Sequence, residues 1–413
     1  MSGTLFVNIR SLVNTRQENK LLRGPEMATL PSLENAWLLV EDGIIADYGE
    51  MKDLPPSLTD MPNTVDASGQ LLLPCWCDSH THLVFAASRE EEFVDKIRGL
   101  SYAEIAARGG GILHSARKLN ESSESELLRL SMARLHEVME LGTGAIEIKS
   151  GYGLSVDGEL KMLRVIRKLK EVSPIPVKAT FLGAHTYPVE YKDNHQGYID
   201  LIIREMLPVI AAEQLADYID VFCETGFFSP AETETICRAG LELGLKPRIH
   251  ANQLNLSGGV QTGVKLGAIS VDHLETMDEP AIRALAGSDT IGTLLPTAAF
   301  FLRMPYQPAR QLIDAGCAIA LASDYNPGSS PSGNMNLVVA MSCIAMRMLP
   351  EEAINAATIN GAYAMELADE LGSIMLGKKA SFILTKPVPS LAYLPYSFGS
   401  GLIDKVMIGG EWI

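Results

Sequence analysis

Two histidines, His80 and His82, stand one residue apart directly after an apolar run in the stretch LLLPCWCDSHTHL. In an extended chain alternate side chains share a face, so both imidazoles can point at one position. Two imidazoles placed in this way can bind one metal ion. An HxH pair is only moderately specific for metal binding, however, and a hydrogen-bonded surface pair is the alternative at this point.

Two further residues strengthen the metal interpretation, because His250 and Asp324 also follow apolar runs. Three imidazoles and one carboxylate suit Zn²⁺ or Fe, and the residue types do not choose between these ions. An ion with an open coordination position lowers the pKa of a bound water toward about 7, so we expect metal-assisted hydrolysis. The expected ligands of a single ion are His80, His82, His250 and Asp324.

Such a reaction also needs groups that move protons and stabilise charge beside the ion. Asp324 can accept a proton from the attacking water and pass it to the leaving nitrogen. His273, in VDHLE, can stabilise the negative charge that develops on the attacked carbonyl oxygen. Which of the two first accepts the water proton stays open, and a cap or core hydrogen bond is the alternative role for His273.

The elements that must position these residues are eight short apolar runs, which alternate with stretches of helical periodicity. Repeated strand–helix units predict an α/β fold with a TIM-like (β/α)₈ barrel, whose active site lies where the strands end. Five of the eight histidines fall at such ends. The segment 83–143 is long for a single crossover. The predicted strands are residues 71–77, 144–148, 177–182, 218–223, 246–249, 268–271, 290–295 and 317–322.

Both chain ends have a different texture of short strands and turns, with a hairpin signal at Glu41-Asp42-Gly43. We therefore predict one small β-sandwich domain built from residues 1–70 and 376–413. The barrel is expected to occupy residues 71–375.

Charge and composition limit the partners. The net charge of −16 argues against nucleic acid and anionic membrane surfaces, which need basic patches, but it permits a small anionic substrate held by a few local cations. No apolar run is long enough for a membrane span, and the first residues do not resemble a signal peptide. Six scattered cysteines without a CxxC pair favour reduced thiols in the cytoplasm. A homodimer is expected because closed dimers are the commonest assemblies.

Six motifs resemble the amidohydrolase superfamily, and the resemblance is closest to the imidazolonepropionase family. They are PCWCDSHTHLVFAASRE, IEIKSGYGLS, FLGAHTYP, RIHANQ, VDHLE and ASDYNPGSSP, and the likeness covers essentially the whole chain. HxH with a late Asp identifies only the superfamily, whereas EIKSGYGLS together with SDYNPGSSP is more specific. The resemblance implies hydrolysis of 4-imidazolone-5-propanoate to N-formimidoyl-L-glutamate in histidine degradation.

The resemblance also implies one Zn or Fe ion on the four ligands named above, together with a set of substrate contacts. Arg89 could pair with the propionate carboxylate, and N–H groups near Gly328 could cradle it. Tyr152 and His185 offer ring faces to a planar heterocycle. The implied substrate contacts are Arg89, Tyr152, His185, Gln253, Asn326, Gly328 and Ser329.

Some positions depart from the family pattern or stay ambiguous. Part of the family has Glu at the position of Gln253, and since an amide cannot act as a base we expect Gln253 to bind substrate. Lys149 resembles the lysine that bridges two metals in related hydrolases, but it follows the wrong strand. Glu224 leaves a second metal site conceivable. The glycine-rich loop 108–112 is either a lid over the site or a plain turn.

Two rival functions stay open at this point. A mononuclear deaminase of a nucleobase or a related ring would share the metal ligands and the small β domain. A non-catalytic assembly protein of the same superfamily would lack the metal ligands, which this chain keeps.

Overall fold

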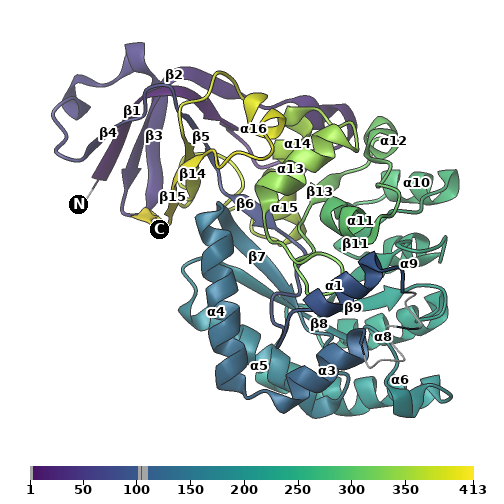
Figure 1. Cartoon of the computed structure of the whole chain (residues 1–413). Coiled ribbons are helices and arrows are strands. Elements are labelled where there is room, and N and C mark those ends of the chain that lie inside the picture. Colours follow the sequence, from purple (N-terminus) through teal and green to yellow (C-terminus); the bar gives the residue numbers. More distant parts are fainter. Residues whose placement is uncertain (1–2, 101–103, 105–109) are drawn as a thin grey trace.

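The computed structural model describes residues 3–100, 104 and 110–413, and its larger unit is a barrel of parallel strands (Figure 1). Neighbours in the barrel are consecutive in the chain, from β6 to β13, so the predicted (β/α)₈ architecture is confirmed. The strands are β6 (Trp76–Asp78), β7 (Thr143–Lys149), β8 (Val177–Ala184), β9 (Tyr218–Cys223), β10 (Lys246–Ala251), β11 (Ser270–His273), β12 (Ile291–Leu294) and β13 (Ile319–Leu321).

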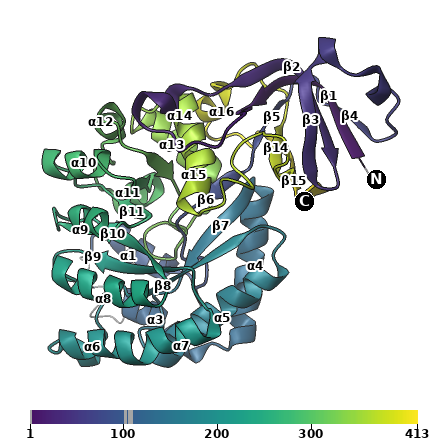
Figure 2. The same ribbon diagram turned by 180° about the vertical axis from the view of Figure 1, so that it is seen from behind.

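Helices cover the outside of these strands, as both views show (Figures 1 and 2). Ser155 caps α5, and Ser229 forms a capping box with Glu232 at the start of α8, in agreement with the sequence pattern. The helices are α4 (Glu124–Glu140), α5 (Val156–Val172), α6 (His195–Leu201), α7 (Leu207–Glu213), α8 (Pro230–Glu242), α9 (Gly259–Lys265), α10 (Glu279–Ala286), α11 (Pro296–Leu302), α12 (Ala309–Asp314), α13 (Met335–Ile344), α14 (Pro350–Ala357) and α15 (Ile359–Ala364).

The long segment between the first two barrel strands contains helices besides its crossover helix. In the described residues these are α1 (Glu90–Ile97) and α3 (Ile112–Glu121). Since α4 packs on α5, it serves as the crossover helix of the first barrel unit. The segment that holds α1 and α3 is an insertion after β6, which accounts for the unusual length of 83–143.

The first predicted barrel strand, residues 71–77, is divided between two sheets. Its first half is β5 (Leu71–Pro74), which pairs with strands of the small sheet. Pro74 has no N–H to continue a ladder. After it, the N–H of Cys75 donates to Ser381 O, whereas that of Trp76 donates to Gly142 O and begins β6. One apolar run therefore contributes to both units.

The barrel closes between its first and last strands through hydrogen bonds at the end of β6 and just beyond β6 and β13. Asp78 accepts from the Ser323 N–H at 2.9 Å and from its hydroxyl at 2.6 Å. The N–H of Asp324 donates to His80 O at 3.0 Å, and the N–H of His82 donates to Tyr325 O at 2.9 Å. These contacts bring residues about 240 positions apart in the chain into adjacent rows.

The smaller unit is a mixed sheet built from both chain ends, as expected, and the marked termini lie close together in it (Figure 1). Phe6 meets Phe382 and Trp412 edge-on, so the sheet curves around an apolar core of its own. The division at 70/71 and 375/376 stays a prediction. The strands are β1 (Gly3–Val13), β2 (Ser32–Glu41), β3 (Ile44–Glu50), β4 (Thr64–Asp66), β5, β14 (Phe382–Thr385), β15 (Ile403–Ile408) and β16 (Glu411–Trp412).

The predicted turn between the second and third strands agrees with the sequence. The predicted hairpin joins β2 to β3, with Asp42 and Gly43 both at positive φ, as the tight hairpin turn requires. Within the described part of the chain, no helix combines the length and apolar character needed to cross a membrane.

We predict that Asp78→Ala destabilises the barrel closure. The substitution leaves the buried N–H and hydroxyl of Ser323 without their acceptor, which should cost about 2–4 kcal/mol and lower Tm by several degrees. Scanning calorimetry of the metal-free protein measures this. Asp78→Asn, which keeps an acceptor, and Asp193→Ala at an exposed position should each change Tm far less. A wild-type Tm for Asp78→Ala would contradict the role given to this contact.

Candidate active site

Three imidazoles and a carboxylate meet at the carboxyl ends of the barrel strands. His80 and His82 follow β6, His250 lies in β10, and Asp324 follows β13. The ring centroids of His80 and His250 are 4.6 Å apart, and those of His80 and His82 are 5.5 Å apart. His80 Nε2 and His82 Nε2 lie 3.6 and 3.7 Å from the same oxygen of Asp324. All four predicted metal ligands are buried and lie together.

The donor atoms fit a metal ion. The Nε2 atoms of His80 and His250 are buried and have no hydrogen-bond partner. Orphaned buried nitrogens are costly unless a ligand satisfies them. One ligand atom from each of His80, His82 and His250 lies within 4.8 Å of the others, and the same holds for His80, His273 and Asp324. N and O donors of this kind suit Zn²⁺ or Fe.

The opposite ring nitrogens show why these two Nε2 atoms are free. His80 Nδ1 lies 2.7 Å from Asp272 Oδ2, and His250 Nδ1 lies 2.9 Å from Asp220 Oδ2. Burial lowers the pKa of both imidazoles, so at neutral pH each is neutral and donates its Nδ1 proton to the carboxylate. Carboxylate–histidine pairs of this kind orient metal ligands.

Sequence reasoning missed Asp220 and Asp272. Each sits inside a fully buried strand, in YIDVFC of β9 and SVDH of β11. A charged residue within a fully buried strand seldom occurs without a partner, and that anomaly was the available signal. It does not identify the partner, because His80 is 192 residues from Asp272 in the chain.

His273 and Asp324, the two candidates for proton transfer, sit on strained backbone. Their φ angles are 87° and 52°, in a region that residues other than glycine seldom adopt. Burial raises the pKa of Asp324 to about 6, against the opposing effect of His273. Burial alone would lower the pKa of His273, but the Glu275 carboxylate, 3.4 Å from Nδ1, leaves it raised.

Tyr152 and His185 line the same space from β7 and β8. Their rings are 5.7 Å apart, and His185 stacks on His82 with centroids 5.4 Å apart. His185 Nδ1 is held 3.0 Å from Gly151 O. A side chain at Gly151 would meet His185 Nδ1 at 2.8 Å, and its φ is 109°, so glycine is needed there. The site thus has a wall of three neighbouring aromatic rings.

The loop that carries Tyr152 is held by one carboxylate from the following helix. Glu159 of α5 is buried and accepts from the N–H groups of Gly151, Gly153 and Leu154, at 3.0, 2.7 and 3.0 Å. Sequence reasoning did not single out Glu159. Its place in the first turn of a helix was visible, but its three acceptor contacts depend on how the preceding loop folds back.

Arg89 lies against the loop that follows β13. A side chain at Gly328 would meet the Arg89 guanidinium at 2.3 Å, so the structure brings these two predicted contacts together. Arg89 Nε donates to Glu92 at 2.9 Å, and Glu92 also accepts from the Gly111 N–H at 2.9 Å. The Arg89 side chain is about one-tenth exposed, so the cation is placed in a largely buried wall.

Asn326 organises the NPGSS loop from within. Its Oδ1 accepts from the N–H groups of Gly328 and Ser329, both at 2.8 Å, and its Nδ2 donates to Asp324 O at 2.7 Å. The Ser329 hydroxyl lies 3.2 Å from Asp324 Oδ2. The two N–H groups that we expected to cradle a substrate carboxylate therefore donate to Asn326 in this structure.

Comparisons with known proteins agree with this site. A family model described as "Amidohydrolase family" matches residues 231–413. The imidazolonepropionase of Flavobacterium johnsoniae is 59% identical over 411 residues, which make up 99% of this chain and 100% of that protein. The imidazolonepropionase of Christiangramia forsetii is 56% identical over 410 residues, 99% of each chain. The chain belongs to the imidazolonepropionase family. This membership confirms the resemblance drawn from the motifs.

A solved structure supports the fold independently. The 5-methylcytosine deaminase from Klebsiella pneumoniae superposes with a TM-score of 0.75 over 99% of this chain and 98% of that one. Its sequence identity is 15%, so this likeness concerns the fold alone. The deaminase alternative thus shares the architecture, whereas the full-length sequence similarity points to the imidazolonepropionase family.

The structure gives the positions of three residues whose roles the sequence of this imidazolonepropionase family member left ambiguous. Gln253 is buried two residues after β10. Glu224 accepts from the N–H groups of Thr225 and Leu254, both at 2.8 Å, which gives it a part in holding the loop next to Gln253. Lys149 forms ion pairs inside the barrel. Within the described residues, Glu224 is absent from both groups of His, Cys, Asp and Glu side chains whose ligand atoms lie within 4.8 Å of one another.

The glycine-rich loop 108–112, for which a lid and a plain turn were both open, falls partly outside the described residues, since 108 and 109 are not among them. Gly110 and Gly111 precede α3, and Gly111 has a φ of 84°. The Gly111 N–H donates to Glu92, the carboxylate that also accepts from Arg89. Glu92 therefore links the described end of this loop to the Arg89 guanidinium.

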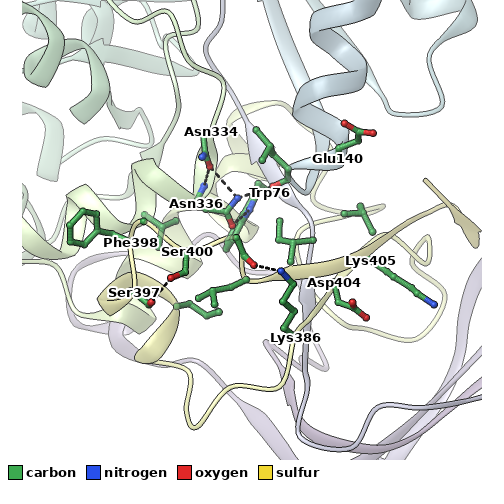
Figure 3. Close-up of a pocket in the computed structure, with 18 of the residues that line it drawn as sticks. Trp76, Glu140, Asn334, Asn336, Lys386, Ser397, Phe398, Ser400, Asp404 and Lys405 are labelled. Atoms are coloured by element: carbon green, nitrogen blue, oxygen red, sulfur yellow. Dashed lines mark hydrogen bonds between the residues drawn. The ribbon is translucent and has the colours of Figure 1, made fainter.

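A pocket of about 450 Å³, drawn in Figure 3, has none of these histidines among its lining residues. It is lined by Trp76, at the beginning of β6, and by residues around α16 (Tyr393–Tyr396) and β15. In it Lys386 Nζ donates to Gly401 O at 2.7 Å. Since Trp76 begins a barrel strand and the histidines follow strand ends, this pocket is distinct from the candidate active site.

We predict that Glu159→Ala loosens the loop that carries Tyr152. Three backbone N–H groups would lose a buried acceptor, so hydrogen–deuterium exchange at residues 151–154 should accelerate at least tenfold. Glu171→Ala, at an exposed position on the same helix, is the matched control and should exchange like wild type. Unchanged exchange in Glu159→Ala would show that the loop is held by other contacts.

Proposed function

We propose that this chain hydrolyses the cyclic amide of 4-imidazolone-5-propanoate to N-formimidoyl-L-glutamate, a step of histidine degradation, with one Zn²⁺ or Fe ion per subunit. The chain is an amidohydrolase by family, and the imidazolonepropionases that it matches are similar over nearly their whole length. The observation that supports the proposal most directly is the buried cluster of His80, His82, His250 and Asp324 with orphaned imidazole nitrogens at the mouth of the barrel.

When bound, the ion would supply an activated water and polarise the ring carbonyl. Water adds to the carbonyl carbon, the amide C–N bond breaks, and the released nitrogen takes up a proton. Asp324 is placed to accept the proton of the attacking water and to return it to that nitrogen. The raised pKa of His273 keeps a proton at hand to stabilise negative charge on the attacked oxygen.

The other side chains of the wall recognise and position the substrate. Tyr152 and His185, whose tilted rings lie 5.7 Å apart, supply aromatic surface against which a small planar ring can pack. Burial lowers the pKa of His185 to about 3, so it acts as a neutral hydrogen-bonding group. The amide of Gln253 can donate and accept at once, which matches the N–C=O of a lactam.

Arg89 supplies the positive charge that a propionate requires. The chain as a whole carries a net charge of −16, so an anionic substrate must meet a local cation. Arg89 lies in contact with Gly328. Burial raises the pKa of Tyr152, and the positive charge of Arg89 opposes that rise. A guanidinium in a largely buried wall binds a carboxylate more strongly than one in water does. The carboxylate would share Arg89 with Glu92 or displace that contact.

We further propose that the enzyme acts in the cytoplasm and forms a homodimer. Its six cysteines are free thiols, five of them buried, which fits a reducing compartment. The dimer rests on the general frequency of closed symmetric pairs. Light scattering of the purified chain measures the oligomeric state directly.

We predict that His250→Ala removes the bound metal and the activity together. Elemental analysis of the purified wild type should give about one Zn or Fe per chain, and His250→Ala should give less than about one-tenth of that. Its kcat for imidazolone hydrolysis should fall at least 1000-fold. His136→Ala, at an exposed position on α4, is the control and should match wild type.

The same assay decides between the proposed reaction and the deaminase alternative. Loss of imidazolone absorbance with formation of N-formimidoyl-L-glutamate supports the proposal. Release of ammonia from a nucleobase, with the imidazolone left intact, would overturn it. A chain that contains no metal and leaves both substrates unchanged would favour the non-catalytic interpretation.

We predict that Arg89→Ala raises KM for the imidazolone propionate about 10- to 100-fold with a smaller effect on kcat, because a charge-assisted hydrogen bond is worth about 1.5–3 kcal/mol. Arg89→Lys should recover only part of the loss, since an ammonium lacks the planar fork. Arg98→Ala, at an exposed position just after the same helix, is the control. An unchanged KM for Arg89→Ala would place the propionate elsewhere.

A further inference from the structure

Lys149 is a fully buried lysine that the proposed reaction does not use. It is the last residue of β7, and its side chain is completely inaccessible to solvent. Its Nζ lies 3.0 Å from Glu147 Oε1 and 2.9 Å from Asp220 Oδ2, and 3.6 Å separates it from Asp272 Oδ2. Burying an ammonium is costly unless it is paired, so these three carboxylates account for its presence.

Two of these carboxylates are the ones that hold the predicted metal ligands. Asp220 accepts from His250 Nδ1, and Asp272 accepts from His80 Nδ1. The Lys149 ammonium faces the same oxygen of each carboxylate that receives the imidazole proton. A single cation therefore joins two carboxylate–histidine pairs that come from β9, β10, β11 and the end of β6.

Without that cation, the two carboxylates would repel each other in a region from which water is excluded. Arg248, also fully buried, forms an ion pair with only one of them. Its Nη2 lies 3.7 Å from Asp272 Oδ2 and donates to Ser79 O, and its Nη1 donates to Ala364 O. In the part of the chain that the structure describes, Lys149 alone forms ion pairs with both Asp220 and Asp272.

We propose that Lys149 is a positioning residue of the metal centre: by bridging Asp220 and Asp272, it fixes His80 and His250 with Nδ1 protonated and Nε2 directed at the ion. This inference rests on the proposed metal-dependent hydrolysis. It assigns Lys149 a role as an ammonium rather than as a metal bridge. The order of contacts is lysine to carboxylate, carboxylate to imidazole, and imidazole to metal.

Lys149→Met tests this role, because methionine keeps the length of the side chain and removes the charge. The first measurement is the dissociation constant for Zn²⁺, obtained by competition with a chromophoric chelator. Partners that orient metal-binding histidines typically contribute 10- to 100-fold in affinity. We therefore expect Lys149→Met to bind Zn²⁺ at least tenfold more weakly than wild type, with one ion per chain at saturation.

The matched control is Lys378→Met. Lys378 is also buried, and its Nζ donates to Leu371 O at 2.9 Å and to Ser373 Oγ at 2.8 Å, both remote in sequence from the ligands. This variant should lose thermal stability as any buried lysine variant does, while its affinity for Zn²⁺ stays within twofold of wild type. A loss of affinity in both variants would show a general structural effect and overturn the specific role.

The second measurement does not need metal. Nitrogen-15 NMR of the histidines in the metal-free protein reports which ring nitrogen carries the proton. Wild type should show His80 and His250 protonated at Nδ1, and Lys149→Met should show mixed tautomers. Unchanged tautomers together with wild-type affinity would overturn the proposal. Because this readout is independent of metal, it tests Lys149 even if the chain proved to bind no ion, an outcome that would refute the proposed function itself.

If Lys149→Met does not fold, the charge-balanced double variant Lys149→Met/Asp220→Asn replaces it, since it removes one cation and one anion together. The inference then requires affinity for Zn²⁺ at least tenfold below wild type, with Asp220→Asn alone retaining more affinity than the double variant. Wild-type affinity in the double variant would overturn the inference.

Discussion

The structure of the candidate active site depends on hydrogen bonds between buried carboxylates and the Nδ1 atoms of two imidazoles. These bonds, at 2.7 and 2.9 Å, are made in a region that water does not reach, so they are strong and have little freedom to change. They decide which ring nitrogen faces the centre of the barrel mouth. If His80 and His250 were close in space but lacked these carboxylate partners, their rings could turn. Their two Nε2 atoms would then not be held unpaired toward one position.

Buried charges of opposite sign inside the barrel strands offset the cost of burying these carboxylates. Glu147, Lys149, Asp220, Arg248 and Asp272 are all fully or almost fully buried. Each would be strongly unfavourable alone, but cations and anions from β7, β9, β10 and β11 pair with one another. These five residues occupy part of the barrel interior that apolar side chains usually fill. Their ion pairs lie next to the residues of the candidate active site.

The substrate side of the site is built differently, from loops. Asn326 holds the NPGSS loop, Glu159 holds the loop of Tyr152, and Glu92 ties Arg89 to Gly111. These contacts join backbone N–H groups to buried side-chain oxygens.

The sequence by itself determined the class of fold and predicted which histidines and which aspartate would gather at one end of the barrel. Alternating strand–helix patterns fixed the barrel, and the polarity of parallel strands placed His80, His250, His273 and Asp324 at one end, because carboxyl ends of parallel strands share an edge. The hairpin at Asp42 was equally local and equally readable.

The tertiary structure alone decided the rest, because it depends on contacts between residues far apart in the chain. The pairing of His80 with Asp272 spans 192 residues, and the closure of Asp78 on Ser323 spans 245. The division of 71–77 between two sheets arises because its first half pairs with β1 and β14, which come from opposite ends of the chain. Local spacing cannot show which buried charge meets which partner, because that is set by strand register and barrel closure.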